Sequence, residues 1–270
     1  MRRIALDHVG VVARDLAALA AEYERLGFTL TPVALQAEGR VGNRCAMLQG
    51  SYLELLAVVD PDRGSATLDR FLARYAGVHI LAFGIADPSA ELARLRRAGF
   101  AAAAIAHSER AVDDADPGGA RARFALIQLP DQPEGRFNLV QHLTREALWQ
   151  ERFLHHANNA VSLEEVALAV EDPFSTAARL SALIGCVATP DRAGGLVLEV
   201  AHGRVRLLPP DRDSPAAPSV ARIAVRTSDR NAAICRLLAE RGIAHDGGGG
   251  AVVVPATLAG GVAVCFLPGA

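Results

Sequence analysis

A single carboxylate in a strongly apolar segment is the first candidate for chemistry. In S-Y-L-E-L-L, Tyr52 and Glu54 alternate with Leu53 and Leu55. Successive side chains of a strand point to opposite faces, so the leucines can face covering helices while Glu54 faces the other way. A carboxylate among apolar residues is costly unless it is paired or ligated. Glu54 therefore indicates either a functional site or an ion pair, for which Arg44 is the candidate partner.

Histidines supply the other candidates. His8 lies in D-H-V-G-V-V, seven residues before Asp15. It shares a strand face with Gly10 and Val12, and a hydrogen-bonded structural histidine would fit the same pattern. The pair His155-His156 has no partner ligands at a usable spacing and reads as solvated linker.

Several other chemistries lack a motif. The four cysteines show no C-x-x-C spacing and read as free thiols. The G-x-S-x-G signature of α/β-hydrolases is absent. The glycines at 247–250 are not followed by a helix with Lys or Ser/Thr, so they indicate a hairpin loop and no phosphate loop.

These candidates lie within a unit that occurs four times, in residues 6–28, 79–100, 163–186 and 220–243. Each copy has an apolar strand, an Asp, a helical segment and a Gly. The aspartates are Asp15, Asp87, Asp172 and Asp229, and the glycines are Gly27, Gly99, Gly185 and Gly242. Asp suits the first turn of a helix, and Gly suits its end. Strand-like segments follow each helix, which predicts βαβββ modules and an α+β fold.

The four modules predict two domains of two modules each, over 1–145 and 161–270. Residues 146–160 form a linker that can carry a helix. We expect each domain to be an open, strongly curved mixed sheet of eight strands, with helices on its convex side. A length of 270 residues fits two domains.

Composition excludes several classes of protein. The apolar fraction is 51% and the charged fraction 21%, which argues against a disordered chain. All 28 basic residues are Arg, scattered among 30 acidic residues, so a nucleic-acid partner is not expected. No membrane-spanning segment or secretory signal is evident, and we expect a cytoplasmic protein with no membrane partner. A homodimer is compatible with this composition.

The opening D-H-V-G-V-V, the Asp-capped helix ending in L-G-F and the strand G-S-Y-L-E-L resemble the vicinal oxygen chelate superfamily. This superfamily includes glyoxalase I and extradiol dioxygenases, and the bacterial glyoxalase-like domain branch is the most similar. The resemblance spans nearly the whole chain. It is strongest over residues 4–60 and 141–150, and beyond the first half only the βαβββ pattern remains. It implies a cleft in which His and Glu side chains hold a divalent metal: Fe, Mn, Ni, Co or Zn.

The resemblance implies metal ligands at specific positions of this chain. His8 fits the first position and Glu54 the second, where Glu54 is also the candidate catalytic residue. In the second module Ile80 stands where a ligand is expected. The adjacent His79 could serve only if a β-bulge shifts it. In N-L-V-Q-H-L, His142 is favoured over Gln141. If Phe137 and Leu139 face the helices, Asn138 and His142 face the cleft.

Substrate contacts are also implied. Asn43 and Arg44, in G-R-V-G-N-R, are candidates to hold the polar end of a substrate, together with Tyr52. In the second half Glu165, Arg206 and Arg222 occupy the ligand positions. These charges neutralise one another and predict a degenerate site.

Three classes of function remain. The first is a metal-dependent lyase, isomerase or dioxygenase that acts on a small molecule with two neighbouring oxygens. The second is a metal-free protein that binds or sequesters a small molecule in the same cleft. The third is a non-catalytic structural module.

Overall fold

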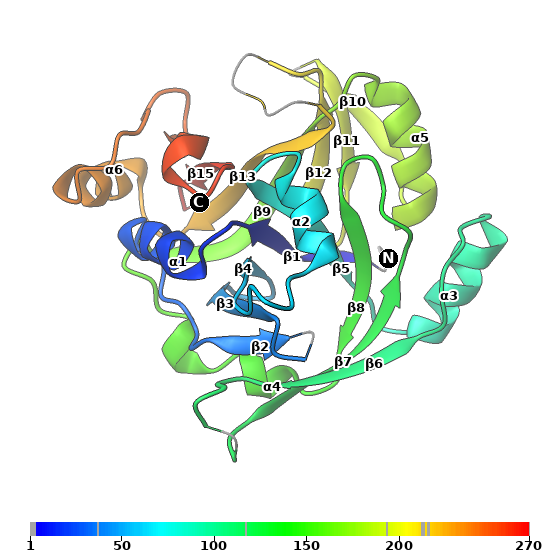
Figure 1. Cartoon of the computed structure of the whole chain (residues 1–270). Coiled ribbons are helices and arrows are strands. Elements are labelled where there is room, and N and C mark those ends of the chain that lie inside the picture. Colours follow the sequence, from blue (N-terminus) through cyan, green and yellow to red (C-terminus); the bar gives the residue numbers. More distant parts are fainter. Residues whose placement is uncertain are drawn as a thin grey trace.

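The computed structural model describes residues 4–36, 38–116, 118–192, 194–211, 214 and 217–269. The fold is built on two curved mixed sheets (Figure 1). The first sheet has eight strands in the order β2-β3-β4-β1-β5-β8-β7-β6, and the second has seven in the order β10-β11-β12-β9-β13-β15-β14.

The strands of the first sheet are β1 (Ala5–Val12), β2 (Ala34–Gln36), β3 (Val41–Met47), β4 (Tyr52–Val58), β5 (Gly77–Gly84), β6 (Ala106–Ala111), β7 (Arg121–Gln128) and β8 (Arg136–His142). Its helices are α1 (Leu16–Arg25), α2 (Ala66–Leu72) and α3 (Pro88–Arg97). The short helices α4 (Arg145–Leu148) and η1 (Glu151–Phe153) follow.

The second sheet contains β9 (Ala160–Ala169), β10 (Ala188–Asp191), β11 (Gly195–Glu199), β12 (Arg204–Leu208), β13 (Ser219–Thr227), β14 (Val252–Val254) and β15 (Ala263–Leu267). Its helices are α5 (Pro173–Ile184), α6 (Asn231–Glu240) and the short η2 (Ala256–Leu258).

Strand pairing confirms the βαβββ modules. In each module the first strand pairs in parallel with the last: β1 with β4, β5 with β8, β9 with β12 and β13 with β15. The first strands of paired modules, β1 with β5 and β9 with β13, run antiparallel. The prediction of eight strands was wrong for the second sheet. In the fourth module one strand is reduced to a bridge between Asp246 and Val253, next to glycines that favour no extended strand.

The helix caps follow the repeat with one exception. Asp15, Asp87 and Asp172 accept hydrogen bonds from backbone N–H groups in the first turns of α1, α3 and α5. The four glycines after the helices have positive φ, from 64° to 96°. Asp229 does not cap α6, since Arg230 is the N-cap residue and the Asp229 carboxylate accepts from Asn159 Nδ2 at 2.7 Å.

The two sheets share one apolar core. Outer-face residues of the first sheet, such as Leu53 and Phe137, belong to the same buried cluster as Val166 and Leu207 of the second. Arginines also join helices of the two halves. Arg94 of α3 donates to the carbonyls of Ala182 and Leu183 at the end of α5. How the chain divides into domains therefore stays a prediction.

The face of each sheet turned away from this core is called its inner face. Edges of the first sheet approach each other, because Asp114 N, after β6, donates to Val33 O, before β2, at 3.1 Å. Leu148 and Phe153, from α4 and η1, pack against one end of this inner face. Among the described residues, no helix has both the length and the hydropathy needed to cross a membrane.

Candidate active site

A cleft of about 890 Å³ opens on the inner face of the first sheet. Its lining includes His8 from β1, Tyr52 and Glu54 from β4, and Asn138 from β8. The start of α2 also contributes, with Thr67 and neighbouring residues. Three of the predicted site residues, His8, Tyr52 and Glu54, therefore lie together in this cleft, and no described residue of the second sheet lines it.

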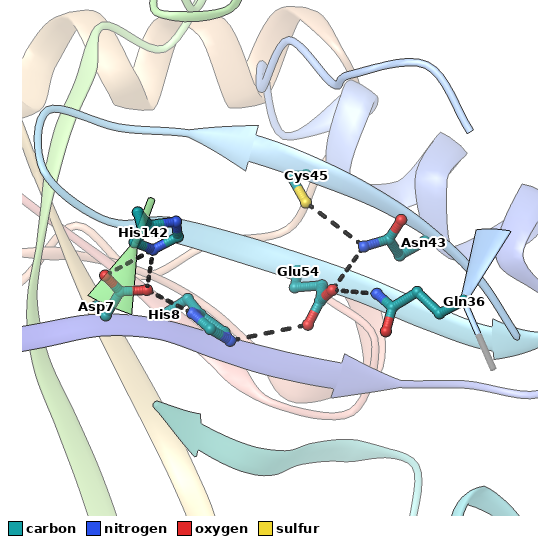
Figure 2. A network of polar contacts seen from close by, with 7 residues as sticks. All are labelled: Asp7, His8, Gln36, Asn43, Cys45, Glu54 and His142. Atoms are coloured by element: carbon teal, nitrogen blue, oxygen red, sulfur yellow. Dashed lines mark hydrogen bonds and ion pairs between the residues drawn. The ribbon is translucent and has the colours of Figure 1, made fainter. Parts of the chain in front are cut away.

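A β-bulge places Asp7 beside His8. The pairing of β1 with β5 shifts between Leu6 and His8, which makes Asp7 the extra residue. Asp7 Oδ1 lies 2.6 Å from His8 Nδ1 (Figure 2). The opposing strand leaves room for this carboxylate at Gly84, where an added Cβ would lie 3.3 Å from Asp7 Oδ2.

Asp7 also contacts a second histidine. His142 Nε2 lies 3.1 Å from both carboxylate oxygens of Asp7. Burial raises the pKa of Asp7, but the hydrogen bonds to His142 and His8 outweigh it and lower the pKa to about 2. An ionised carboxylate only accepts hydrogen bonds, so it selects the His8 tautomer with a proton on Nδ1. The lone pair on His8 Nε2 then faces the cleft.

Glu54 is held by two amides. Its Oε1 accepts from Asn43 Nδ2 at 2.5 Å and from Gln36 Nε2 at 2.8 Å (Figure 2). Its Oε2 lies 3.9 Å from His8 Nε2. Hydrogen bonds from these two amides compensate for the cost of burying the Glu54 carboxylate in an apolar strand. Arg44, the expected ion-pair partner, does not take part.

Tyr52 completes the wall beside the histidine. Its ring stacks on His8 with centroids 4.3 Å apart and planes 18° from parallel. Burial, followed by the negative charges of Asp7 and Glu54, raises the pKa of Tyr52 well above its ordinary value. The Tyr52 phenol is therefore neutral at ordinary pH. Its stacked ring holds the plane of the His8 imidazole.

Strand register identifies the equivalent positions in the second module. His8 pairs with Tyr52, and Glu54 follows two residues later. In β5 and β8, Ile80 pairs with Arg136, and Asn138 follows two residues later. Asn138 thus occupies the position that matches Glu54. Its Oδ1 is buried and has no hydrogen-bond partner among the residues that the structure describes.

Two histidines predicted as metal ligands lie elsewhere. A bulge does occur at His79, because the register shifts from Gly10–Ile80 to Val11–Val78. Its side chain nevertheless stacks between Phe71 and Tyr75, and its Nε2 bonds to the Tyr75 carbonyl at 2.8 Å. His142 is on the inner face, but it binds Asp7 and does not line the cleft. In this structure neither side chain lines the cleft, and the ligand role of the two histidines stays a prediction.

Three further candidates have side chains that bond elsewhere or support another residue. Gln141, the alternative to His142, donates to the Ala86 carbonyl at 2.7 Å and does not reach the cleft. Arg44 donates to the Thr31 carbonyl and pairs with Glu24 at 2.9 Å, away from the cleft. Asn43 is buried and supports Glu54, so it holds no substrate in this arrangement.

Sequence analysis missed Asp7 and Gln36 as supporting residues, and it placed Asn138 on the cleft face without naming it as a ligand. The signal for Asn138 was present, since its distance from Arg136 repeats the spacing of Tyr52 and Glu54. For Asp7 the D-H pair was visible, but strict strand alternation assigns the two side chains to opposite faces. Only the bulge brings them together.

The available donors suit a divalent metal in part. His8 Nε2 and Glu54 Oε2 face each other, and each group has its other polar atom fixed by a partner, as is typical of metal ligands. Asn138 lines the same cleft, and its amide oxygen, which has no hydrogen-bond partner among the described residues, is a candidate third donor. Within the described ranges, no group of three His, Cys, Asp or Glu side chains is arranged to hold a metal. A metal would therefore need the Asn138 amide or water.

The second sheet has different chemistry at the same positions. Arg204 pairs with Glu165 in the register of Tyr52 and His8, which makes Arg206 the counterpart of Glu54. Glu165 lies 2.7 Å from Arg204 Nε, 3.3 Å from Arg206 Nη2 and 3.4 Å from Arg222 Nη2. The predicted mutual neutralisation of these charges is present. The Glu165 oxygens are already bound by cations.

Comparison with known proteins agrees with this architecture. The model of a glyoxalase-like domain matches residues 6–184. No curated protein matches the sequence. Solved structures share the fold. A hypothetical protein from Staphylococcus aureus has a TM-score of 0.72 at 11% identity, with 98% of this chain and 99% of that chain covered.

Two further structures come from named enzymes. A triple mutant of 4-hydroxymandelate synthase from Streptomyces coelicolor has a TM-score of 0.64 at 19% identity, covering 91% of this chain and 77% of that chain. The Mn(II)-bound glyoxalase from Novosphingobium aromaticivorans has a TM-score of 0.61 at 14% identity, covering 99% and 83%. Identities this low show the fold alone. With the family model matching most of the chain, the protein belongs to the glyoxalase-like domain family of the vicinal oxygen chelate superfamily.

Proposed function

We propose that the cleft of the first sheet binds a divalent metal and acts as a lyase, isomerase or dioxygenase on a small molecule with two neighbouring oxygens. His8 Nε2 and Glu54 Oε2 are the principal ligands in this proposal, and Asn138 Oδ1 is the third. The metal would be Fe, Mn, Ni, Co or Zn, all of which accept imidazole and oxygen donors. The Mn(II)-bound glyoxalase among the similar structures supports a metal in this fold.

The observation that carries the proposal is the support given to each donor. Asp7 holds a proton on His8 Nδ1 and so leaves Nε2 as an acceptor. Asn43 and Gln36 occupy one Glu54 oxygen and leave the other facing His8. Partners of this kind typically change metal affinity by about 10–100-fold when they are removed.

When bound, the metal would supply stabilisation of negative charge on substrate oxygens, or a binding position for O₂. The chain's own residues have separate roles. Tyr52 and the apolar side chains of Leu126 and Val140 line the cleft and would exclude water from the substrate body. Glu54, if substrate displaces it, would accept a proton as a general base.

A metal-free binding protein is the second candidate. Ile80 stands at one of the four ligand positions, and Asn138 offers an amide where Glu54 offers a charge. Both changes weaken a metal site compared with four charged or imidazole donors. The same cleft could then bind a small molecule through Tyr52 and the Glu54 carboxylate.

Elemental analysis separates the two candidates. Protein purified without a His-tag or chelator, then reconstituted with each of the five metals in turn and desalted, should retain about one metal per chain. His8→Ala should lose it, whereas Glu165→Gln, in the second sheet, should retain it. Absence of stoichiometric metal from the wild-type protein under all five conditions would leave the binding-protein candidate.

A further inference from the structure

One arginine on the inner face of the first sheet stands apart from its neighbours. Arg110 of β6 is paired with Ala122, which belongs to the buried inner-face cluster, and Arg110 lines the cleft. Its guanidinium lies 5.9 Å from the Phe124 ring centroid. It also interacts with the Cys45 thiol on β3, so its side chain extends across the curled sheet.

The Cys45 thiol does not supply a negative charge that would pair with Arg110. Burial, followed by the charge of Glu54, raises the pKa of the Cys45 thiol to about 12. The thiol is therefore neutral at ordinary pH. Cys45 pairs with Glu54 in the β3–β4 register, so Arg110 reaches the strand next to the proposed ligand.

Two other arginines that line the cleft are neutralised by carboxylates. Arg136 pairs with Asp131 at 3.0 Å, and Arg121 pairs with Glu109. The Arg110 guanidinium donates a 3.2 Å hydrogen bond from Nη1 to the Ala111 carbonyl. Within the described part of the chain, no carboxylate oxygen lies within 4.0 Å of its guanidinium.

A half-buried guanidinium with spare N–H donors is suited to an anionic ligand. It offers five donors in a planar fork that matches a carboxylate in a bidentate manner. Hydrogen bonds between such charged groups are roughly twice as strong as those between neutral groups.

We propose that Arg110 binds a carboxylate on the substrate, a group separate from the two oxygens that would chelate the metal. This inference deepens the proposed function and rests on it only for the position of the reacting end. The substrate class is then an apolar-bodied carboxylic acid that carries a vicinal pair of oxygens. Tyr52, Phe124, Leu126 and Val140 supply an apolar wall of the same cleft for the substrate body.

A carboxylate fits this site better than a phosphate does. The lining also carries acidic residues, including Glu38 and Asp114, and these disfavour a doubly charged group. Arg136, which also lines the cleft, is already paired with Asp131. One guanidinium without a carboxylate partner balances one negative charge.

The test uses 3-(3,4-dihydroxyphenyl)propionate and its methyl ester, which share a catechol and differ in the charge. Binding to Co²⁺-loaded protein is measured by anaerobic calorimetry. Wild type should bind the acid at least tenfold more tightly than the ester. Arg110→Gln should bind both equally, with its affinity for the ester unchanged. The control is Arg123→Gln, since Arg123 is exposed on the neighbouring strand and does not line the cleft.

A second pair of probes separates this proposal from the metal. On chelator-treated protein, 3-phenylpropionate has no catechol and should still bind, with the affinity lost in Arg110→Gln. That result would support carboxylate binding by Arg110 whether or not the protein binds a metal. Equal affinities of wild type for acid and ester, or an acid preference that persists in Arg110→Gln, would overturn the proposal. Tighter binding of 3-phenylpropyl phosphate than of 3-phenylpropionate would overturn the choice of carboxylate.

Discussion

The inner faces of the two sheets have the same register and opposite chemistry. In the first sheet His8, Tyr52 and Glu54 lie where the second has Glu165, Arg204 and Arg206. Even the bulges recur, since Asp7 and Glu164 are each the extra residue before the first of these positions. Asp7 binds two imidazoles, whereas Glu164 binds Ser162 and Arg226.

This difference shows how one backbone can keep or lose a site. Neutral imidazole and a carboxylate leave lone pairs that face open space. Arginine has no lone pair to offer and satisfies the carboxylate beside it. The second sheet therefore retains a stable, neutralised face, and its shape alone says nothing about function.

The largest effect is expected at Glu54, whose counterpart in the second sheet is Arg206. Glu54→Gln keeps the size of the side chain but removes its charge, so we expect metal affinity to fall by more than roughly 100-fold, beyond the usual effect of a supporting residue. Calorimetry with Mn²⁺ measures this. An affinity within threefold of wild type would mean that Glu54 is not a ligand.

A second contrast lies in the bulge of the neighbouring strand, where the first sheet has His79 and the second has Ala221. Burial lowers the pKa of His79 to about 4, although its hydrogen bond to Tyr75 opposes the shift. The unfolded chain takes up this proton near pH 6.5 and the folded chain only near 4, so stability falls as pH decreases through that window.

The loss from His79 amounts to roughly 3 kcal/mol at most. Urea unfolding of wild type and His79→Phe at pH 7 and pH 4.5 isolates this contribution. The variant keeps a ring between Phe71 and Tyr75, and it should lose less stability on acidification. Identical losses in the two proteins would show that His79 is protonated as easily when folded.

Asp7→Asn should have an intermediate effect on the site. The amide cannot hold both imidazoles as the carboxylate does, and we expect about 10–100-fold weaker Mn²⁺ binding. Glu164→Gln, at the matching bulge of the second sheet, is the control and should leave affinity unchanged. Equal effects of the two substitutions would place the site elsewhere.

The smallest effect concerns the helix caps. Asp172 caps α5, whereas Asp229 does not cap α6. Asp172→Ala should cost about 1 kcal/mol of unfolding free energy. Asp229→Ala should cost only a few tenths of that, since its side-chain bond to Asn159 is exposed. Thermal melts distinguish them, and equal costs would contradict the assignment of the caps.

The sequence predicted the repeated architecture because caps and glycines are local features, readable at Asp15 or Gly185. It also placed His8 and Glu54 on one face of the sheet, because the family resemblance singled out these positions and alternation along each strand assigns their faces. Asp7, Asn138 and Arg110 depend on bulges, inter-strand register and sheet curvature, which arise from pairing between distant segments. His79 illustrates the limit, since the bulge considered for it exists but its ring turns toward Phe71 and Tyr75.

The position of a bound metal tests the central claim most directly. Crystals of the reconstituted wild-type protein in Mn²⁺ should show an anomalous difference peak about 2.2 Å from both His8 Nε2 and Glu54 Oε2, at ordinary bond lengths for such ligands. The second sheet should show none at Glu165. A peak at Glu165, or metal bound without contact to His8 and Glu54, would contradict the account.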